Sequence, residues 1–448
     1  MTKKHQYASL SIAANVGLSR WQKISLAAVA AGFALQILSL MGFALPNQDF
    51  WLFLSLSLML IGMLAYARFT YKDSPEGIKN NGIWHRQLTS RGAIAWFLAL
   101  VLTGFYIALY WFPESLGLGS NGLQNSGLIG FFDPLSMLMK SKPASQWFVY
   151  GVLYTLMVLG MGIKFIWKYR HDRYQVIRTL SVVFFQLVFA FLLPEILAGF
   201  NMPYNDLKSI WPLNYTFFFD WHLTEMLNSG FFGIFVLFWG IFSFVVLAPV
   251  LTYFFGKRWY CSWVCGCGGL AETAGDPFRH LSDKSKTAWK VEKWMIYSIL
   301  GIVTIMTLLV LYTFFTGVEQ VLFINSRQLS SWYGLFIGAA FSGVIGVGFY
   351  PLLGNRVWCR FGCPMAAYLG ILQKHFSRFR ITTNGGQCIS CGNCSASCEM
   401  GIDVKSYAQQ GQDIVRASCV GCGICSAVCP RGVLRLENGK VELSKTFE

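Results

Sequence analysis

Long apolar runs alternate with short polar segments over most of the chain. A helix that crosses a bilayer needs about 20 consecutive apolar residues. Eight runs of roughly this length lie near residues 23–45, 50–70, 92–112, 145–167, 177–199, 230–255, 293–316 and 330–353. The pattern therefore predicts an all-α polytopic membrane bundle of about eight transmembrane helices. No small-residue cleavage site follows the first run, which is also too long for a signal-peptide core, so we expect a retained anchor.

The segments between these runs differ in positive charge. Lys and Arg gather before the first run and after the second, fourth and sixth runs, whereas residues 46–49, 113–144, 200–229 and 317–329 carry few. By the positive-inside rule, both termini and all the cysteines are then cytoplasmic. We expect a multi-pass protein of the bacterial inner (cytoplasmic) membrane.

Composition agrees with the membrane class. The chain is 54% hydrophobic and only 13% charged, whereas a soluble domain carries about 25% charged residues. The net charge of +15 would suggest a nucleic-acid partner for a soluble protein. Here the position of Lys and Arg in alternate loops explains the charge, so we expect the lipid bilayer as a partner and no nucleic acid.

The apolar runs stop near residue 380, and this change divides the chain. We expect a cytoplasmic N-terminal segment at 1–22, a transmembrane bundle at 23–379 and a small α+β module at 380–448. All thirteen cysteines lie between Cys261 and Cys429. A secreted disulfide framework would not be distributed so unevenly in a chain of this length.

The cysteines of the C-terminal module form a doubled pattern, Cys388-x2-Cys391-x2-Cys394-x3-Cys398 and Cys419-x2-Cys422-x2-Cys425-x3-Cys429-Pro430. In bacterial two-cluster ferredoxins, three close thiolates hold one [4Fe–4S] cube and the fourth ligates the other cube. Cluster one should then use Cys388, Cys391, Cys394 and Cys429, and cluster two should use Cys419, Cys422, Cys425 and Cys398. Zinc is the alternative, but it usually takes two pairs of ligands rather than two runs of four. Glu399 stands where the second run has Pro430, a change that could tune the potential of cluster two.

A second cysteine pattern is repeated outside this module. Gly-x-Arg-x-aromatic-Cys-x3-Cys occurs twice, at the ends of the sixth and eighth runs, and ends in the pairs Cys261/Cys265 and Cys359/Cys363. The repeat indicates two related halves that place both pairs at similar depth, with Arg258 and Arg356 in the membrane interface.

The repeated pairs have three possible roles. The four thiols could be buried packing residues, redox-active catalytic thiols, or ligands to a further metal centre. Basic neighbours would lower their pKa and favour the last two roles. Cys267 is an extra thiol that could join such a centre.

Together, the two Cys-x3-Cys segments after membrane helices and the two-cluster ferredoxin resemble the NapH/NosR-type polyferredoxin membrane proteins. This is the family of the membrane quinol dehydrogenase subunit of periplasmic nitrate reductase systems. The resemblance covers roughly residues 230–435, and the first motif departs from it because Gly266 and Cys267 follow Cys265 where the family has Pro. It implies an oxidoreductase component that exchanges electrons between quinone or quinol and a partner redox protein. An alternative function is a metal- or thiol-reducing maturation factor for another redox complex.

Residues that would indicate other cofactors are few. All six histidines fall in loops or at helix ends, and the sequence contains no Cys-x-x-Cys-His, so we expect no haem. It also lacks a flavinylation signal, so we expect no covalent flavin. Glu195, Asp220, His222 and Glu225 cluster near the outer ends of the runs, where they could form a proton exit or quinol site or be ordinary polar groups of the membrane interface. Such a site would be separated from cytoplasmic clusters by about 30 Å of hydrocarbon.

Overall fold

The computed structural model describes residues 18–43, 46–72, 91–119, 124–318, 320–321 and 324–439. Within these residues, seven helices are long and apolar enough to cross a membrane. Four are the uninterrupted α1 (Arg20–Leu40), α2 (Gln48–Tyr71), α3 (Ala93–Trp111) and α6 (Gln146–Lys168), and the long α14 (Lys286–Thr316) is a fifth. The predicted all-α multi-pass bundle is therefore confirmed. Lys3, Lys4, His5, Lys79, His85 and Arg86 lie outside the described residues.

Two of the seven helices contain wider π-helical turns near their middles. One runs from α7 (Arg173–Phe184) through η2 (Phe185–Leu192) into α8 (Leu193–Gly199). The other runs from α10 (Gly230–Phe242) through η3 (Ser243–Leu247) into α11 (Ala248–Phe255). In each case a proline, Pro194 or Pro249, follows the π-helical turns within two residues. Because proline removes a backbone donor, it locally disturbs the α-helical pattern.

The eighth apolar run differs from a plain spanning helix. It folds as α15 (Ser326–Trp332) continued by the π-helical η5 (Tyr333–Ile345), and after a turn the chain forms the short α16 (Tyr350–Leu353). The run was predicted at 330–353, so the structure begins the helix earlier and breaks it before the predicted end. Glycines between Gly338 and Gly348 account for the break because glycine weakens a helix interior.

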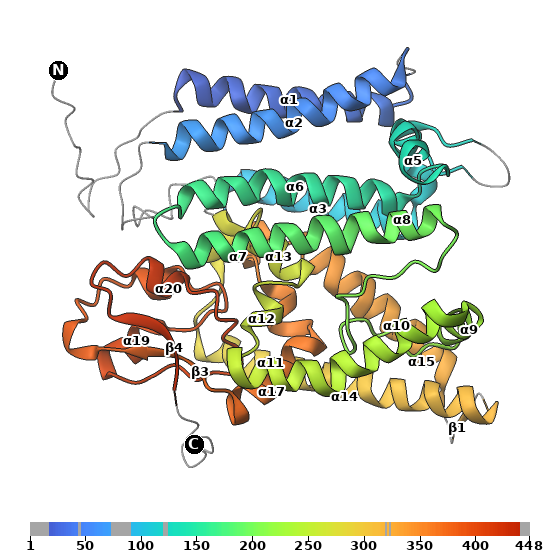
Figure 1. Cartoon of the computed structure of the whole chain (residues 1–448). Helices are drawn as coiled ribbons and strands as arrows, with labels where there is room; N and C mark the ends of the chain where they lie inside the picture. Colours follow the sequence, from blue (N-terminus) through green and yellow to red (C-terminus); the bar gives the residue numbers. More distant parts are fainter. Residues whose placement is uncertain are drawn as a thin grey trace.

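The helices pack as layers (Figure 1). The pair α1 and α2 lies on one side and contacts the rest of the bundle mainly through α6. Inside this pair, the Gln36 amide donates a hydrogen bond of 3.2 Å to the Ser55 hydroxyl, and both side chains are buried. A polar contact of this kind helps membrane helices associate where lipid gives no hydrophobic driving force between them.

Short elements close one end of the bundle. They are η1 (Pro113–Leu116), α4 (Gly127–Phe131), α5 (Asp133–Lys140), α9 (Asp220–Asn228) and the two-stranded β1 (Gln320–Val321) and β2 (Ile324–Asn325). In Figure 1, α5 and α9 lie at the opposite end of the long helices from the C-terminal module. These elements belong to the segments that are poor in Lys and Arg.

The C-terminal module is a compact unit at the other end. It contains β3 (Phe379–Thr383), η7 (Gly385–Gln387), α18 (Asn393–Ala396), α19 (Val404–Gln410), α20 (Ile424–Ala427) and β4 (Leu434–Asn438). Strands β3 and β4 pair antiparallel, with Ile381 opposite Leu436. The strand pair brings both ends of the module together, so the two cysteine runs lie in the loops between its strands.

Candidate iron–sulfur sites and the buried cysteine repeat

Two small cavities in the C-terminal module are each lined by four cysteines. The cysteines of one are Cys388, Cys391, Cys394 and Cys429, and those of the other are Cys398, Cys419, Cys422 and Cys425. These are the two sets that the ferredoxin spacing predicts, with the fourth cysteine of each run crossing to the other cavity. The donor set and its grouping therefore fit two [4Fe–4S] clusters. The assignment of individual ligands stays a prediction.

The two cavities differ in their access to solvent. Cys391 beside the first cavity is exposed. In the second set, Cys419 is 7% and Cys425 is 6% exposed. Cluster one therefore belongs at the surface of the module, and cluster two belongs deeper, on the side that faces the membrane bundle.

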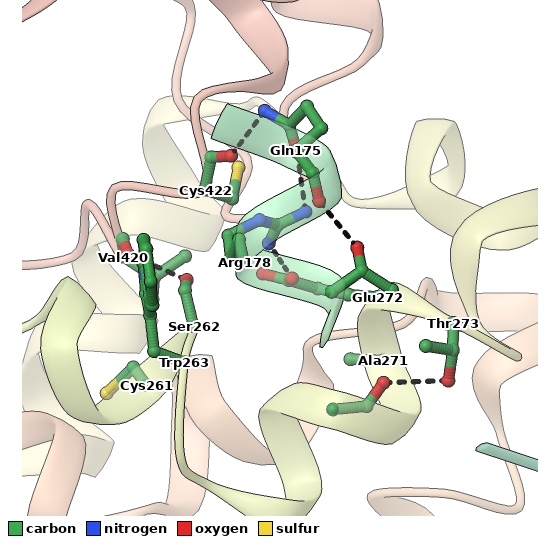
Figure 2. A network of polar contacts seen from close by, with 12 residues as sticks. Gln175, Arg178, Cys261, Ser262, Trp263, Ala271, Glu272, Thr273, Val420 and Cys422 are labelled. Atoms are coloured by element: carbon green, nitrogen blue, oxygen red, sulfur yellow. Dashed lines mark hydrogen bonds and ion pairs between the residues drawn. The ribbon is translucent and has the colours of Figure 1, made fainter. Parts of the chain in front are cut away.

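Four consecutive carbonyl groups attach the cluster-two loop to the bundle. Gln373 donates to the Cys419 carbonyl, Ser262 to that of Val420, Tyr174 to that of Gly421 and Gln175 to that of Cys422, at distances of 2.8, 2.8, 2.8 and 2.9 Å. Figure 2 shows the Ser262 and Gln175 bonds. The donors come from separate segments, so the loop is held from several sides. Cluster two is therefore fixed directly against the first cysteine motif, which contains Ser262.

The repeated cysteine motifs begin with two sharp turns. Gly256 ends α11 with a φ of 65°, and Gly354 follows α16 with a φ of 96°. Residues other than glycine rarely adopt such φ angles. An added Cβ at Gly354 would also lie only 2.5 Å from the Ser282 hydroxyl. The first turn leads into α12 (Arg258–Cys261) and α13 (Gly266–Glu272). The second leads into η6 (Trp358–Gly362) and α17 (Pro364–Phe376).

The four motif cysteines meet in one buried region. Cys261, Cys265, Cys359 and Cys363 are 5–7% exposed, and three of them belong to the same core cluster. Arg356 joins the two motifs, since its Nη1 donates to the Cys261 carbonyl at 3.2 Å and lies 3.7 Å from the Cys359 sulfur. The sequence repeat thus reflects two segments that fold onto each other.

The first motif reaches the level of the helix middles rather than the membrane surface. Gln186 in η2 donates to the Val264 carbonyl at 2.7 Å, and Tyr154 in α6 donates to the Gly266 carbonyl at 2.8 Å. Both donors lie near the middle of their spanning helices. Figure 1 also shows α12 and α13 among the long helices rather than beyond their ends. After its glycine turn, the first motif thus folds back into the bundle.

The two motif arginines have different environments. Arg356, which was predicted in the interface, is 1% exposed and forms ion pairs with Glu272 and Glu399 at 2.6 and 2.9 Å. Arg258 is half-buried, with its guanidinium 4.5 Å from the centre of the Phe379 ring, which is a cation–π contact. Only Arg258 therefore keeps partial exposure, and burial of Arg356 requires the two glutamates.

Glu399 is the centre of a buried ionic network that the sequence alone did not indicate. Its carboxylate also pairs with Arg279 at 2.8 Å, and its exposed fraction is 0%. Burial would raise the pKa of Glu399, but Arg279 and Arg356 outweigh burial and lower the pKa to about 2. The residue that replaces the usual proline is therefore a charged link between the module and the motifs.

Glu272 continues the network toward the module. It forms an ion pair with Arg178, which also donates to the Gln175 side chain at 2.7 Å (Figure 2). Gln175 in turn donates to the Cys422 carbonyl. A continuous chain of charged and hydrogen-bonded groups thus runs from the second motif to a predicted ligand of cluster two.

Burial, rather than neighbouring charge, dominates the acidity of three motif thiols. It raises the pKa of Cys261 to about 12, although Lys257 and Arg356 act in the opposite direction. It also raises the pKa of Cys359 and Cys363. Basic neighbours do act to lower the pKa of Cys261 and Cys359, as expected, but burial outweighs them. A metal would have to displace the proton for them to become thiolates.

The remaining two thiols form a pair. A hydrogen bond from the Cys267 side chain lowers the pKa of Cys265 to about 6. Among the residues that the structure describes, no three His, Cys, Asp or Glu side chains are placed to hold a single metal ion. The eight ferredoxin cysteines do not form such a group either, because the thiolates around a cube each bind a different iron. The geometry therefore gives no support to a one-ion centre at the motifs.

The acidic group near the other end of the bundle does not form one site. Glu195 pairs with Lys140 at 2.7 Å, and His222 is buried with its Nδ1 3.0 Å from the Phe217 carbonyl. Asp220 and Glu225 are exposed. These side chains have separate structural partners or face outward, so the predicted proton-exit or quinol group gains no support here.

Comparisons with known proteins extend these observations. The 4Fe-4S dicluster domain family matches residues 387–434, and the 4Fe-4S binding domain family matches residues 231–285 and 335–382, which contain the two repeated motifs. The chain is 24% identical over 176 residues to YccM of Escherichia coli, a candidate electron transport protein, covering 37% of this chain and 47% of YccM. It is 27% identical over 156 residues to the methylamine utilization ferredoxin-type protein MauN of Methylobacillus flagellatus, covering 34% of this chain and 52% of MauN.

These matches define the class of the protein. The chain spans about half the length of the curated relatives it matches. No solved structure matches the chain. The protein is a helical multi-pass membrane protein with a C-terminal ferredoxin-type domain for two [4Fe–4S] clusters. The narrower resemblance to the NapH/NosR-type family remains a proposal.

Proposed function

We propose that this protein is a membrane-bound iron–sulfur electron carrier that exchanges electrons between quinone and a partner redox protein, in the manner of the NapH/NosR-type family. The observation that carries the proposal is the attachment of the cluster-two loop to the first cysteine motif through four consecutive carbonyls. A rigid attachment of this kind keeps redox centres at a short, fixed separation. The names of YccM and MauN, which refer to electron transport and a ferredoxin-type protein, support the same function.

The arrangement gives an order to the electron path. The motif cysteines lie within the bundle, cluster two would lie on the side of the module that faces them, and cluster one would lie at the exposed surface beside Cys391. A bound [4Fe–4S] cluster would accept and release one electron at a time. The chain's own contribution is to hold the centres in sequence and to leave the last one accessible to a partner protein.

The depth of the motifs reduces the distance that electrons must cross. A quinone site near the opposite membrane face would lie about 30 Å from centres at the first face. Contacts of Val264 and Gly266 with Gln186 and Tyr154 place the first motif near the middle of the helices instead. We infer that the module faces the cytoplasm of a bacterial cell, in agreement with the distribution of Lys and Arg.

We further propose that the four motif thiols bind an additional iron–sulfur centre. The 4Fe-4S binding domain family covers both motifs. The thiols are buried, so exchange with a soluble thiol partner is hindered, and the buried cations Lys257 and Arg356 would compensate the charge of thiolate ligands. Cys261, Cys265, Cys359 and Cys363 are the expected ligands.

Iron content tests this additional centre. Two cubes alone give about 8 irons per chain, so we expect anaerobically prepared protein to contain clearly more. A Cys359→Ser variant should lose the excess and return to about 8 irons, while a Ser298→Ala variant, changed on the half-buried surface of α14, should keep it. The same count of about 8 irons in all three proteins would exclude the centre.

Maturation of another redox complex is the second candidate function. The observation that favours it is the side-chain contact between Cys265 and Cys267, since an adjacent thiol pair could reduce or pass on a metal. In that case, Cys267→Ser should abolish delivery of copper or reducing equivalents to an acceptor. Quinone would have no effect on such delivery.

Electron exchange with quinol tests the main proposal directly. Purified protein, kept anaerobic, is mixed with a reduced menaquinol or ubiquinol analogue, and the clusters are followed by EPR. We expect reduced-cluster signals to appear rapidly and to disappear when the oxidised analogue is added in excess. Clusters that dithionite reduces but neither quinol reduces would contradict the exchange with quinone.

A further inference from the structure

A cavity of about 160 Å³ lies inside the bundle, apart from the cluster cavities. Its polar lining consists mainly of tyrosines from four segments, namely Tyr106, Tyr110, Tyr150, Tyr215 and Tyr333. Tyr106 and Tyr110 belong to α3, Tyr150 to α6 and Tyr333 to the start of η5. No Asp, Glu, Lys, Arg or His side chain lines it in the part of the chain described here.

Three of these tyrosines have hydroxyl groups available for a ligand. Tyr106 and Tyr150 bond to each other, with 3.3 Å between their oxygens. Tyr110, Tyr215 and Tyr333 have no hydrogen-bond partner within the described ranges, and Tyr333 is only 4% exposed. None of the three hydroxyl oxygens is fully buried, so a molecule in the cavity can reach each of them. They can therefore donate a hydrogen bond to, or accept one from, a ligand with oxygen atoms.

The wall of the same cavity includes residues of both cysteine motifs. Cys267 contributes from the first motif, next to Cys265, and Trp358 and Pro364 contribute from the second, next to Cys359 and Cys363. A ring in this cavity would thus be separated from the motif thiols by one side chain. The cavity therefore lies beside the start of the proposed electron path.

Size and polarity limit the class of ligand. A volume of about 160 Å³ is smaller than the usual 300–1,000 Å³ of cofactor pockets, so it suits one ring system rather than a haem or a dinucleotide. Aromatic walls favour a flat ring, phenol hydroxyls favour carbonyl or hydroxyl oxygens, and the absence of charged lining residues favours a neutral molecule. These properties describe a quinone ring.

A second, larger cavity differs from the tyrosine-lined cavity in the charge of its lining. It measures about 310 Å³ and lies between α14, α17 and the C-terminal module. Its lining includes five cations, Lys257, Lys293, Arg360, Lys374 and Arg416, and one anion, Glu292, which pairs with Arg360. A neutral ring gains nothing from so many positive charges, so this cavity is the poorer match for a quinone.

We propose that the tyrosine-lined cavity binds the ring of a quinone or quinol. The hydroxyls of Tyr110, Tyr215 and Tyr333 would bond the ring oxygens, and Cys267 and Trp358 would lie between the ring and the motif thiols. This inference rests on the proposed function and adds the location of its substrate site.

Binding of 2-methyl-1,4-naphthoquinone to the detergent-solubilised holoprotein tests the site by calorimetry. Tyr333→Phe removes one hydroxyl without changing the ring, and it should weaken binding about five- to tenfold. Gly343→Ala would place a Cβ 3.0 Å from Tyr110 and 3.2 Å from Tyr106, and by narrowing the cavity it should weaken binding at least tenfold. Tyr312→Phe, at an exposed tyrosine of α14, and Gly301→Ala, where an added Cβ meets no atom within 4 Å, are the matched controls and should bind as the unchanged protein does.

The possible results of this experiment distinguish failure of the proposed binding site from failure of the proposed function. Equal binding by all the variants, or no binding by the unchanged protein, would overturn the inference. Binding that the cavity variants weaken supports it even if bound quinol fails to reduce the clusters. That last failure would count against the proposed function alone. Unchanged visible absorbance of the clusters in each variant shows that loss of binding is not loss of folding.

Discussion

Replacement of Glu399 with alanine is expected to destabilise the protein by about 3–5 kcal/mol, because it removes one partner from a buried ionic network. The carboxylate pairs with Arg279 at 2.8 Å and with Arg356 at 2.9 Å, and both arginine residues are buried, with exposed fractions of 3% and 1%. Both cations would stay buried with fewer counter-charges. The loss should be measured as the shift in urea-induced unfolding of the solubilised protein, followed by circular dichroism.

The position of Glu399 makes the effect local at first. It follows Cys398, a predicted ligand of cluster two, and it contacts the second motif through Arg356. We therefore expect the EPR signal of cluster two to be lost at lower urea concentration than that of cluster one. Glu399→Gln keeps the shape and one acceptor oxygen, so its effect should be intermediate.

A matched control is available in the same module. Glu437 is exposed, and among the polar contacts that the structure describes its side chain contacts only the Thr382 hydroxyl, at 3.0 Å. Glu437→Ala should change stability by less than about 0.5 kcal/mol. Equal unfolding of the Glu399→Ala and Glu437→Ala variants would show that the network contributes nothing to stability.

The charges around Glu399 also suit an anionic cluster nearby. The connected groups are the cations Lys168, Arg178, Arg279 and Arg356 and the anions Glu272, Asp276 and Glu399, and all of them except the half-buried Lys168 are buried. One positive charge is in excess, and the network reaches the Cys422 carbonyl through Gln175. Four thiolates around a cluster would carry negative charge, so the surplus lies where it can offset that charge.

Local patterns in the sequence predicted much of this architecture. The run at 230–255 coincides with the helix from Gly230 to Phe255 because it is apolar throughout. The cysteine spacing predicted two sets of four, and the two cavities contain those same sets, because the curl of each run depends on neighbouring residues. Such signals lie within one helix or one loop, which is why a single sequence contains them.

Features that depend on distant residues could not be predicted in this way. Arg356 next to a membrane run suggested the interface, but Glu272 and Glu399 neutralise it inside the bundle. Gln186 and Tyr154, which hold the first motif at depth, look like ordinary residues of apolar helices. Five tyrosines from four segments share a cavity only after folding. A polar residue within a long apolar run, such as Gln186, is the one signal that could have indicated a buried partner.

Removal of cluster one is expected to stop electron delivery to a protein acceptor while leaving cluster two reducible. A Cys388→Ala/Cys391→Ala double variant loses two of the four cysteines that line the outer cavity. Cluster two is held by a separate set and by four hydrogen bonds from the bundle, so it should persist. Iron content should fall by about 4 per chain.

The reason for the large effect is distance. Electron transfer weakens steeply as centres move apart, and a protein acceptor can approach only the module surface beside Cys391. With quinol as donor, reduction of cytochrome c should fall at least about 100-fold, equivalent to roughly 2.7 kcal/mol in barrier height. The EPR signal of cluster two should still appear on mixing with quinol. Gln410→Ala, an exposed change in the same module, should leave both measurements unchanged.

Two contrary results would each carry a definite meaning. Cytochrome c reduction at the normal rate would show that electrons leave the protein without cluster one, and the proposed order of centres would then be wrong. A quinol that no longer reduces cluster two would place cluster one between quinone and cluster two, which reverses the path. The bundle holds cluster two through Gln373, Ser262, Tyr174 and Gln175. The structure therefore argues against both of these results.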